Sequence, residues 1–201
     1  MARIKMTKSE LKAQRRELQR YQRFLPTLQL KKQQLQIEVQ RVRAGLEEVQ
    51  QEERDLEKNL QEWISLFAEA IDIESLLKVD RAEIRKENVV GLTVRRFRDI
   101  RFEERSPDLF QSPPWVDDGL EAVKEAVRLR LQKEFLQEEV RLLEVELRRT
   151  SQRVNLFEKV KIPECRENIR IIQIALGDLQ TMAVVRAKLA KAKLSERSSG
   201  L

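Results

Sequence analysis

Residues 28–67, LQLKKQQLQIEVQRVRAGLEEVQQEERDLEKNLQEWISLF, decide the fold of this chain. Apolar residues in this stretch recur at alternating steps of three and four, which is the a/d heptad pattern of a coiled coil. The pattern reaches back towards the N-terminus in two interleaved series. One series, interrupted at Lys32 and Glu53, comprises Leu11, Leu18, Leu25, Val39, Leu46, Leu60 and Phe67. The other comprises Tyr21, Leu28, Leu35, Val42, Val49, Leu56 and Trp63. We therefore predict a long helix within residues 1–71, capped at its start by Thr7 or Ser9.

Residues 119–201 carry a second heptad pattern. Its apolar seam comprises Leu129, Leu136, Val140, Leu143, Leu147, Val154, Phe157, Cys165, Ile169, Ile172, Leu176 and Leu179. Between Phe157 and Cys165 the step is eight residues instead of seven, so the register slips by one residue. Pro163 stands beside this slip and predicts a local bend or rewinding of the helix. The predicted helix runs from about Gly119 to Leu194, and the polar tail from Ser195 is expected to fray.

The region between these helices, residues 72–118, has a different texture. Residues 72–87 keep a helical character, but the strict heptad fades. Residues 88–94, NVVGLTV, are β-branched around a glycine, and residues 95–102, RRFRDIRF, alternate charged and apolar side chains. These two segments predict two short strands.

Two heptad helices of similar length, joined by about 45 residues, can pair antiparallel within one chain. The predicted fold is therefore all-α: a long antiparallel two-helix coiled-coil hairpin with a small central β-hairpin and short-helix region. Pro26 should kink the first helix and lie at nearly the same height as Pro163. Both basic chain ends would then meet at one free tip. The alternative is that each helix pairs with another chain in a parallel dimer.

The composition fits long helices and excludes several kinds of site. Of the 201 residues, 37% are charged and only 5% are aromatic, which is typical of helices that bury a narrow seam. The chain has no histidine and one cysteine, Cys165, so neither a Cys/His zinc site nor an internal disulfide can form. A P-loop, a nucleophile elbow and a Gly-rich dinucleotide turn are all missing. We expect no catalytic residue, no cofactor, no metal and no membrane span.

Charge divides the chain into blocks. Residues 1–44 hold about twelve Lys and Arg against three acids, whereas residues 45–87 hold about thirteen acids against six bases. The stretch after Leu179 is basic again. A basic end points to an anionic partner, which leaves open an acidic protein around the tip, a nucleic acid, or simply a solvated helix face. Aromatic stacking platforms are not interleaved with the bases, which favours a protein over a nucleic acid.

Several segments support a family resemblance. They are TKSEL at residues 7–11, LKKQQL at 30–35, NVVGLTV at 88–94, and RVNLFE, IP and NIRII between Arg153 and Ile172. Together they resemble the D subunit of the V-type and A-type rotary ATPases, and the resemblance covers nearly the whole chain. It implies a non-catalytic rotor shaft, threaded through a hexamer of catalytic A and noncatalytic B subunits. Such a shaft couples ATP hydrolysis or synthesis to the passage of protons or sodium through a membrane ring.

The resemblance also implies partners and contact surfaces. The family's shaft binds the F subunit and stands on the funnel-shaped C subunit (the d subunit in eukaryotes), on the cytoplasmic side of the membrane. The predicted hexamer bearing comprises Lys8, Leu11, Lys12, Arg15, Arg16, Arg186, Lys188, Leu189, Lys191 and Lys193. The predicted partner-docking strand comprises Arg96, Phe97, Arg98, Ile100 and Arg101. The alternative function is a coiled-coil protein that binds nucleic acid, or tethers other molecules, through the same basic tip.

Overall fold

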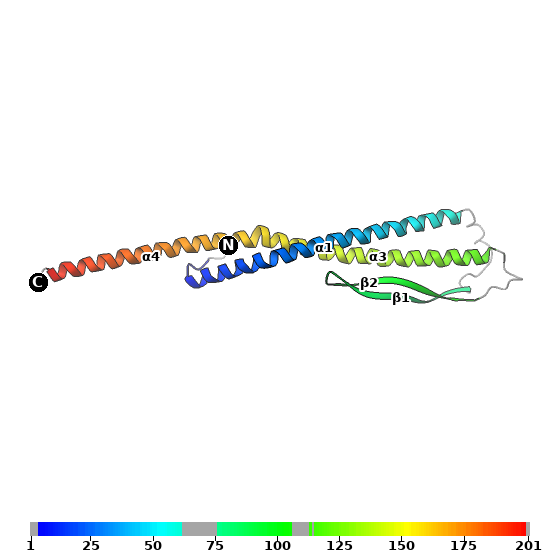
Figure 1. The fold of residues 1–201 in the computed structure, drawn as a ribbon, viewed down its shortest axis with the longest axis horizontal. Helices are drawn as coiled ribbons and strands as arrows, with labels where there is room; N and C mark the ends of the chain where they lie inside the picture. Colours follow the sequence, from blue (N-terminus) through cyan, green and yellow to red (C-terminus); the bar gives the residue numbers. More distant parts are fainter. Residues whose placement is uncertain (1–3, 62–75, 106–112, 114, 200–201) are drawn as a thin grey trace. The chain divides into compact units, whose positions relative to one another are not determined.

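The computed structural model describes residues 4–61, 76–105, 113 and 115–199, with side chains as far as residue 194. In chain order the elements are α1 (Lys8–Gln61), β1 (Leu77–Val89), β2 (Leu92–Glu104), α3 (Val116–Leu156), the π-helical turn η2 (Phe157–Lys161) and α4 (Ile162–Ser199) (Figure 1). The chain forms two compact units. Residues 1–30 and 150–201 make up the first, and residues 31–149 make up the second.

The first helix, α1, begins at the predicted cap. Thr7 Oγ1 accepts a hydrogen bond of 3.3 Å from the backbone N–H of Glu10, which confirms Thr7 as the capping residue. The helix then continues through Pro26. Proline has no N–H to donate to the carbonyl four residues earlier, so α1 loses one backbone hydrogen bond at this point.

In the unit of residues 31–149, α1 and α3 run antiparallel. Three ion pairs join them: Lys31 with Glu146, Arg43 with Glu144, and Glu53 with Lys133. Because residues later in α1 meet residues earlier in α3, the two helices point in opposite directions. This pairing and the two-stranded antiparallel sheet confirm the predicted mostly α fold with a small β-hairpin.

The unit of residues 1–30 and 150–201 repeats the antiparallel arrangement. The ring of Tyr21 lies 4.9 Å from the ring of Phe157, measured between centroids. One to two turns nearer the start of α1, Gln14 Oε1 accepts a hydrogen bond of 3.4 Å from Asn168 Nδ2. Pairing within the chain is therefore present in both units.

The register slip predicted beside Pro163 takes the form of η2. The N–H of Ile162 donates to the carbonyl of Phe157, five residues earlier, and this adds one residue to the turn. The seam steps three residues from Val154 to Phe157, five to Ile162 and three to Cys165. The single step of five absorbs the slip, so the seam stays on one side of the helix.

The two prolines do not lie at the same height, contrary to the prediction. Pro163 falls between Phe157 and Asn168, the partners of Tyr21 and Gln14, so it faces the part of α1 between those two residues. Pro26 lies roughly two helical turns farther along α1. The offset arises because α4 continues well past the level at which α1 begins.

The hairpin turn has an unusual backbone. Val89 pairs with Leu92, and the two residues between them have positive φ, 51° at Val90 and 84° at Gly91. Positive φ at both central positions is the mark of a type I′ turn, whose twist matches the flanking strands. Asn88 Oδ1 accepts a hydrogen bond of 2.9 Å from the N–H of Gly91, which fixes the turn.

The predicted placement of the two strands was wrong. Residues 88–94 contain the turn instead of a strand, and residues 77–87, predicted to be helical, form most of β1. Residues 95–102 belong to the longer β2. Lys, Glu and Arg fill residues 77–87 and favour helix locally, whereas the strand conformation comes from pairing with β2.

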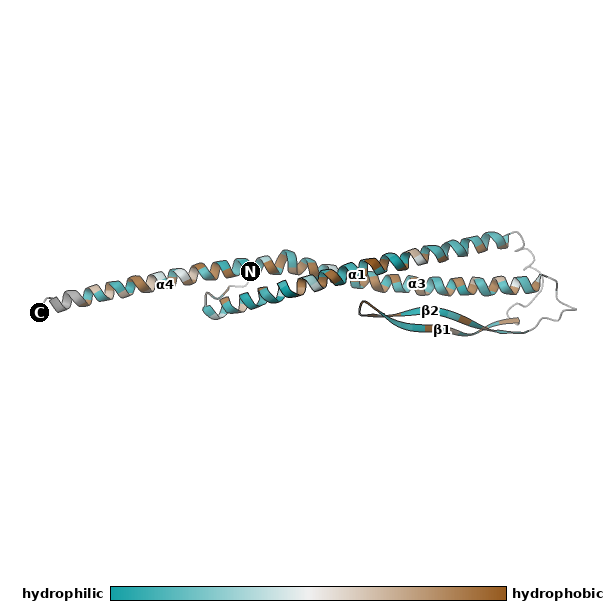
Figure 2. Ribbon diagram, in the orientation of Figure 1, coloured by the Kyte–Doolittle hydropathy of each residue, from teal (hydrophilic) through white to brown (hydrophobic). Residues whose placement is uncertain are grey.

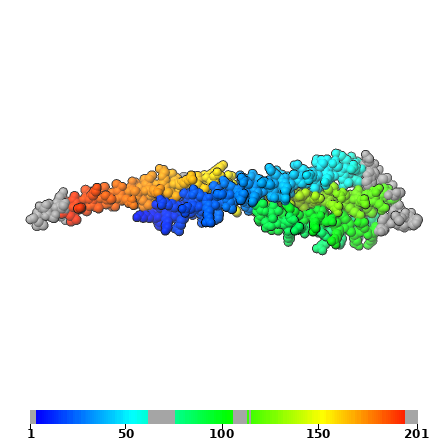
Figure 3. Space-filling view, in the orientation of Figure 1, coloured from blue at the N-terminus to red at the C-terminus, as the bar shows by residue number. Residues whose placement is uncertain are grey.

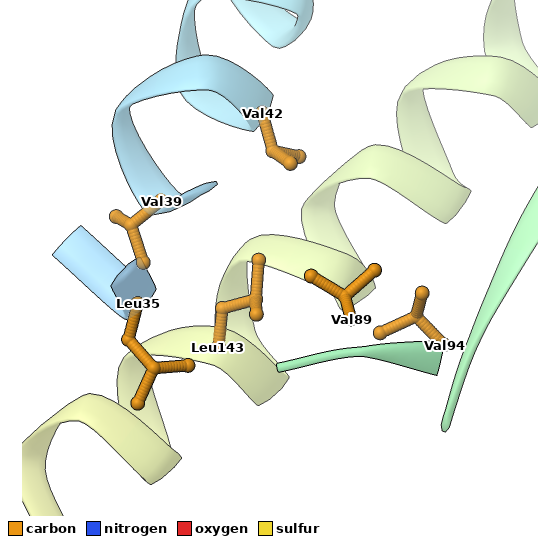
Figure 4. Packing of buried hydrophobic residues seen from close by; sticks show 6 residues of the cluster. All are labelled: Leu35, Val39, Val42, Val89, Val94 and Leu143. Carbon is orange, nitrogen blue, oxygen red and sulfur yellow. The ribbon is translucent and has the colours of Figure 1, made fainter. Parts of the chain in front are cut away.

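The core of the second unit lies where the hairpin turn meets both helices. Its buried members are Leu35, Val39 and Val42 of α1, Val89 and Val94 of the hairpin, and Leu143 of α3 (Figure 4). Each such side chain contributes about 1.5–3 kcal/mol by leaving water. The hairpin is thus part of the core of this unit.

The structure sorts the predicted seam residues by burial. The buried ones are Leu35, Val42, Val49, Leu143, Val154, Cys165 and Ile172. The half-buried ones are Leu18, Leu25, Leu28, Leu46, Leu56, Leu60, Leu147, Phe157, Ile169 and Leu176. Trp63 and Phe67 lie outside the described residues.

The seam ends before Leu179, whose side chain is 56% exposed. The reason is that α1 begins at Lys8 and has no helical residue opposite this position. Beyond it α4 continues as helix to Ser199, so the predicted fraying from Ser195 was wrong. The run of Ala, Lys, Leu, Arg and Ser residues contains no helix breaker before Gly200.

Candidate partner-binding surfaces

The last described part of α4, residues 179–194, is exposed along its whole length. It holds no acid and four bases, Arg186, Lys188, Lys191 and Lys193. Its large apolar side chains are between 49% and 67% exposed: Leu179, Met182, Val184, Val185, Leu189 and Leu194. Apolar and polar residues are mixed along this segment (Figure 2), and the α1 part of the same unit does not lie over it in the view of Figure 3.

These apolar side chains point to all sides of the helix. At about 100° per residue, Leu189 lies about 140° around the axis from Val184, and Leu179 lies about 220° from it. A neighbouring helix covers a single stripe of another helix. A partner that buries all of these side chains must therefore surround α4.

The basic residues at the start of α1 do not join this segment. Lys8, Lys12, Arg15 and Arg16 are exposed on the first turns of α1, and Leu11 is half-buried. Since Gln14 pairs with Asn168, Lys8 is level with about residue 174 of α4. Arg186 lies about a dozen residues farther, roughly 18 Å along the axis. The prediction that both basic ends meet at one tip was wrong.

A charged clamp fastens β2 to α3. Arg96 Nη2 donates to Glu139 Oε1 at 2.8 Å, Arg96 Nε lies 3.3 Å from both Glu139 oxygens, and Arg96 Nη1 donates to Glu87 Oε2 at 2.6 Å. Glu139 is only 2% exposed. The hydrogen bonds from Arg96 to Glu139, followed by the charges of Glu139 and Glu87, raise the pKa of Arg96. Beside the clamp the ring of Phe97 stacks on Phe135, with centroids 6.1 Å apart.

The remaining residues of the predicted docking strand divide between core and solvent. Ile100 is 4% exposed, whereas Arg98 and Arg101 are exposed. Arg98 has no partner across the ladder, and Arg101 Nη2 donates to Glu83 Oε1 at 2.8 Å. The expectation of an exposed strand from Arg96 to Arg101 is therefore corrected, because β2 uses Arg96, Phe97 and Ile100 to pack within its own unit.

Sequence reasoning missed the α3 side of the clamp. Glu139 lies three residues after Leu136 and four before Leu143, so helical spacing places it beside the apolar seam. A carboxylate buried at such a position requires a cation beside it. The spacing of Glu139 was therefore the signal in the sequence for a buried ion pair. Nothing in the sequence singled out Arg96 as that cation, because the partner lies 43 residues away.

The described residues hold no group of three His, Cys, Asp or Glu side chains that could bind a metal ion. Cys165 is 3% exposed, and burial raises the pKa of its thiol, as befits a seam residue. In the same part of the chain, none of the helices is both long enough and apolar enough to cross a membrane.

Comparison with known proteins gives a consistent result. Residues 10–192 match the profile of the family described as the D subunit of ATP synthase. A protein from Borreliella burgdorferi, named as the D subunit of a V-type ATP synthase, is 42% identical over 198 residues, which cover 98% of each chain. Proteins of the same name from Chlamydia abortus and Chlamydia muridarum are 33% and 35% identical, and each alignment covers 96% of this chain. These alignments cover 95% and 97% of the two relatives.

Proposed function

This chain belongs to the family of ATP synthase D subunits, and we propose that it is the central rotor shaft of a V/A-type ATPase. It is a non-catalytic subunit of a complex whose work is ATP synthesis and ion transport. In the proposed role, the shaft couples ATP hydrolysis or synthesis in a catalytic hexamer to the movement of protons or sodium through a membrane ring.

The observation that carries this proposal is the exposed end of α4. Residues 179–194 present apolar side chains on all sides together with four bases and no acid. A ring of subunits around the helix covers every side at once, whereas a single partner on one side cannot. Exposed charge pairs are individually weak, about 0–1 kcal/mol, so the bases supply many shallow contacts without one deep minimum. Shallow contacts suit a bearing that has to turn.

The paired helices supply the stiffness that a shaft needs. In the unit of residues 31–149, ion pairs such as Lys31 with Glu146 at 2.8 Å join α1 to α3 beside the buried seam. In the unit of residues 1–30 and 150–201, the seam continues through Val154, Cys165 and Ile172. Twisting one helix about the other would pull these close-packed side chains out of register.

The proposed partners follow from the family. We propose that the hexamer of A and B subunits surrounds the end of α4, with Lys8, Lys12, Arg15 and Arg16 of α1 as further contacts. We propose the F subunit and the C subunit (the d subunit in eukaryotes) as partners of the hairpin region, with Arg98 and Arg101 on the exposed side. The shaft would then stand on the cytoplasmic face and meet the membrane only through the rotor ring.

Truncation tests the proposal. A chain that ends after Leu179 loses the exposed basic segment but keeps every buried seam residue. We expect this chain to lose association with the A and B subunits when the complex is purified from membranes. The matched control ends after Leu194 and should still associate. Full association of the shorter chain would count against a shaft held by its α4 end.

A further inference from the structure

The outer strand of the hairpin, β1, has an open edge. Among the described residues the sheet has two strands. β2 contacts α3 through Arg96 and Phe97, whereas β1 reaches the core at its last residue, Val89. In an antiparallel ladder, alternate residues direct their N–H and C=O groups away from the partner strand. Half of the 13 residues of β1 therefore offer free backbone donors and acceptors along that edge.

Proteins normally protect such an edge with proline, with shortness, with charged side chains or with bulges. β1 has no proline, and at 13 residues it is long for a strand. Its pairing with β2 has two irregularities: Asp80 is skipped between Val79 and Arg81, and Arg98 of β2 is skipped between the partners of Glu83 and Ile84. With Asp80 left out of the alternation along β1, Val79 and Ile84 fall on the same face of this strand, and they are 54% and 45% exposed. The edge is thus open and flanked by apolar side chains.

The charges on β1 are unbalanced once the contacts within the hairpin are counted. Glu83 binds Arg101 and Glu87 binds Arg96, so β2 takes up both glutamates of β1. The bases of β1 are Lys78, Arg81, Arg85 and Lys86, and its one further acid is Asp80. Only Arg85 approaches an acid in the described structure, at 3.8 Å from the already engaged Glu87. The strand therefore presents a net positive charge to any partner.

From these features we infer that β1 accepts an extended strand from another polypeptide, in which acidic and apolar residues alternate. The added strand would place its apolar side chains next to Val79 and Ile84 on one face. Its acids would lie next to Arg81 and Arg85 on the other face. Side chains alternate between the two faces along a strand, and Arg81 and Arg85 are each an odd number of residues from Ile84. Backbone pairing supplies affinity, and the alternating side chains supply specificity. This inference deepens the proposed docking role of the hairpin. It rests on that role in one respect, namely that the partner is another protein of the ATPase complex.

Hydrogen exchange in the assembled ATPase tests the inference directly. We expect alternate backbone amides of β1, from Ala82 to Asn88, to exchange at least about tenfold more slowly in the complex than in the free chain. The double charge reversal R81E/R85E should abolish this protection. The matched variant Arg95→Glu, which reverses an exposed base on β2 that lies outside the proposed contacts, should leave it unchanged. Both variants alter side chains outside the hairpin core, so that core stays intact.

Three results would overturn the inference. The β1 amides could exchange equally fast in the free chain and in an intact complex, or the R81E/R85E variant could keep full protection. Protection that rises with the concentration of the isolated chain would instead show that a second copy occupies the edge. In each case the complex still assembles. Failure of the proposed shaft role would appear differently, as a chain that does not join the hexamer at all.

Discussion

Glu139 is the buried charge that joins α3 to the hairpin. Its carboxylate is almost completely buried and accepts hydrogen bonds only from Arg96 among the described contacts. Taking a charge out of water is costly, and a close hydrogen-bonded partner offsets that cost. A clamp of this kind fixes where β2 lies along α3 more firmly than apolar contacts alone, since apolar side chains tolerate sliding.

We expect Glu139→Gln to destabilise the chain by about 1–3 kcal/mol, because Arg96 loses its main charged partner. The matched control is Glu138→Gln, which removes an exposed carboxylate that pairs with Arg141 on the same helix. Exposed pairs contribute little, so this control should leave the unfolding midpoint unchanged. Chemical denaturation followed by circular dichroism measures both variants. Equal effects of the two substitutions would mean that the buried pair has no special role.

The absence of histidine shapes the pH dependence of stability. No side chain has an ordinary pKa between pH 5 and 8. Glu138 and Glu167 have lowered pKa values because Arg141 and Arg170, respectively, donate hydrogen bonds to them. A carboxyl with a lowered folded-state pKa contributes stability above its unfolded pKa, and this contribution is lost as the pH falls through the folded pKa.

Thermal unfolding should therefore have the same midpoint at pH 6 and pH 8 and a lower one below about pH 4. The measurement is a series of thermal melts at constant ionic strength. A change of several degrees between pH 6 and pH 8 would reveal a titrating group that these contacts do not include.

Among the elements, η2 explains how a proline and an eight-residue step coexist in one helical run. Pro163 cannot donate to the carbonyl four residues earlier, and its ring crowds that carbonyl. Widening the preceding turn makes room for the ring and also takes up the extra residue. The seam before and after the turn then follows the same alternation of three and four.

Deleting Lys159 from η2 should be tolerated. The deletion shortens the step from Phe157 to Cys165 from eight residues to seven, so the seam keeps its side of the helix without a π-helical turn. Deleting the exposed Arg166 instead shortens the step from Cys165 to Ile172 to six residues. It moves Ile172 off the seam and should cost roughly 2–5 kcal/mol. Thermal melts of both deletions provide the comparison, and a greater loss from the Lys159 deletion would refute this account of η2.

For the whole molecule, the sequence predicted the helices far better than the hairpin. Heptad spacing reports directly on which side of a helix is buried, so α1, the seam through Val154 and Cys165, and the slip beside Pro163 were all readable. The strand β1 was misread, because its Lys, Glu and Arg residues have helical propensity and its pairing with β2 leaves no local signal. The clamp between Arg96 and Glu139 was missed for the same reason, since it joins distant parts of the chain. The expected common tip failed because periodicity shows which side of a helix pairs but not how far each helix extends.

The central claim is that this chain turns inside the hexamer. The direct measurement fixes A and B subunits to a surface and attaches a visible probe to the exposed hairpin through Arg98→Cys, with the buried Cys165 replaced by alanine. Addition of ATP should make the probe rotate continuously in one direction, and removal of ATP should stop it. A probe that stays fixed on a bound chain while the hexamer hydrolyses ATP would contradict the claim.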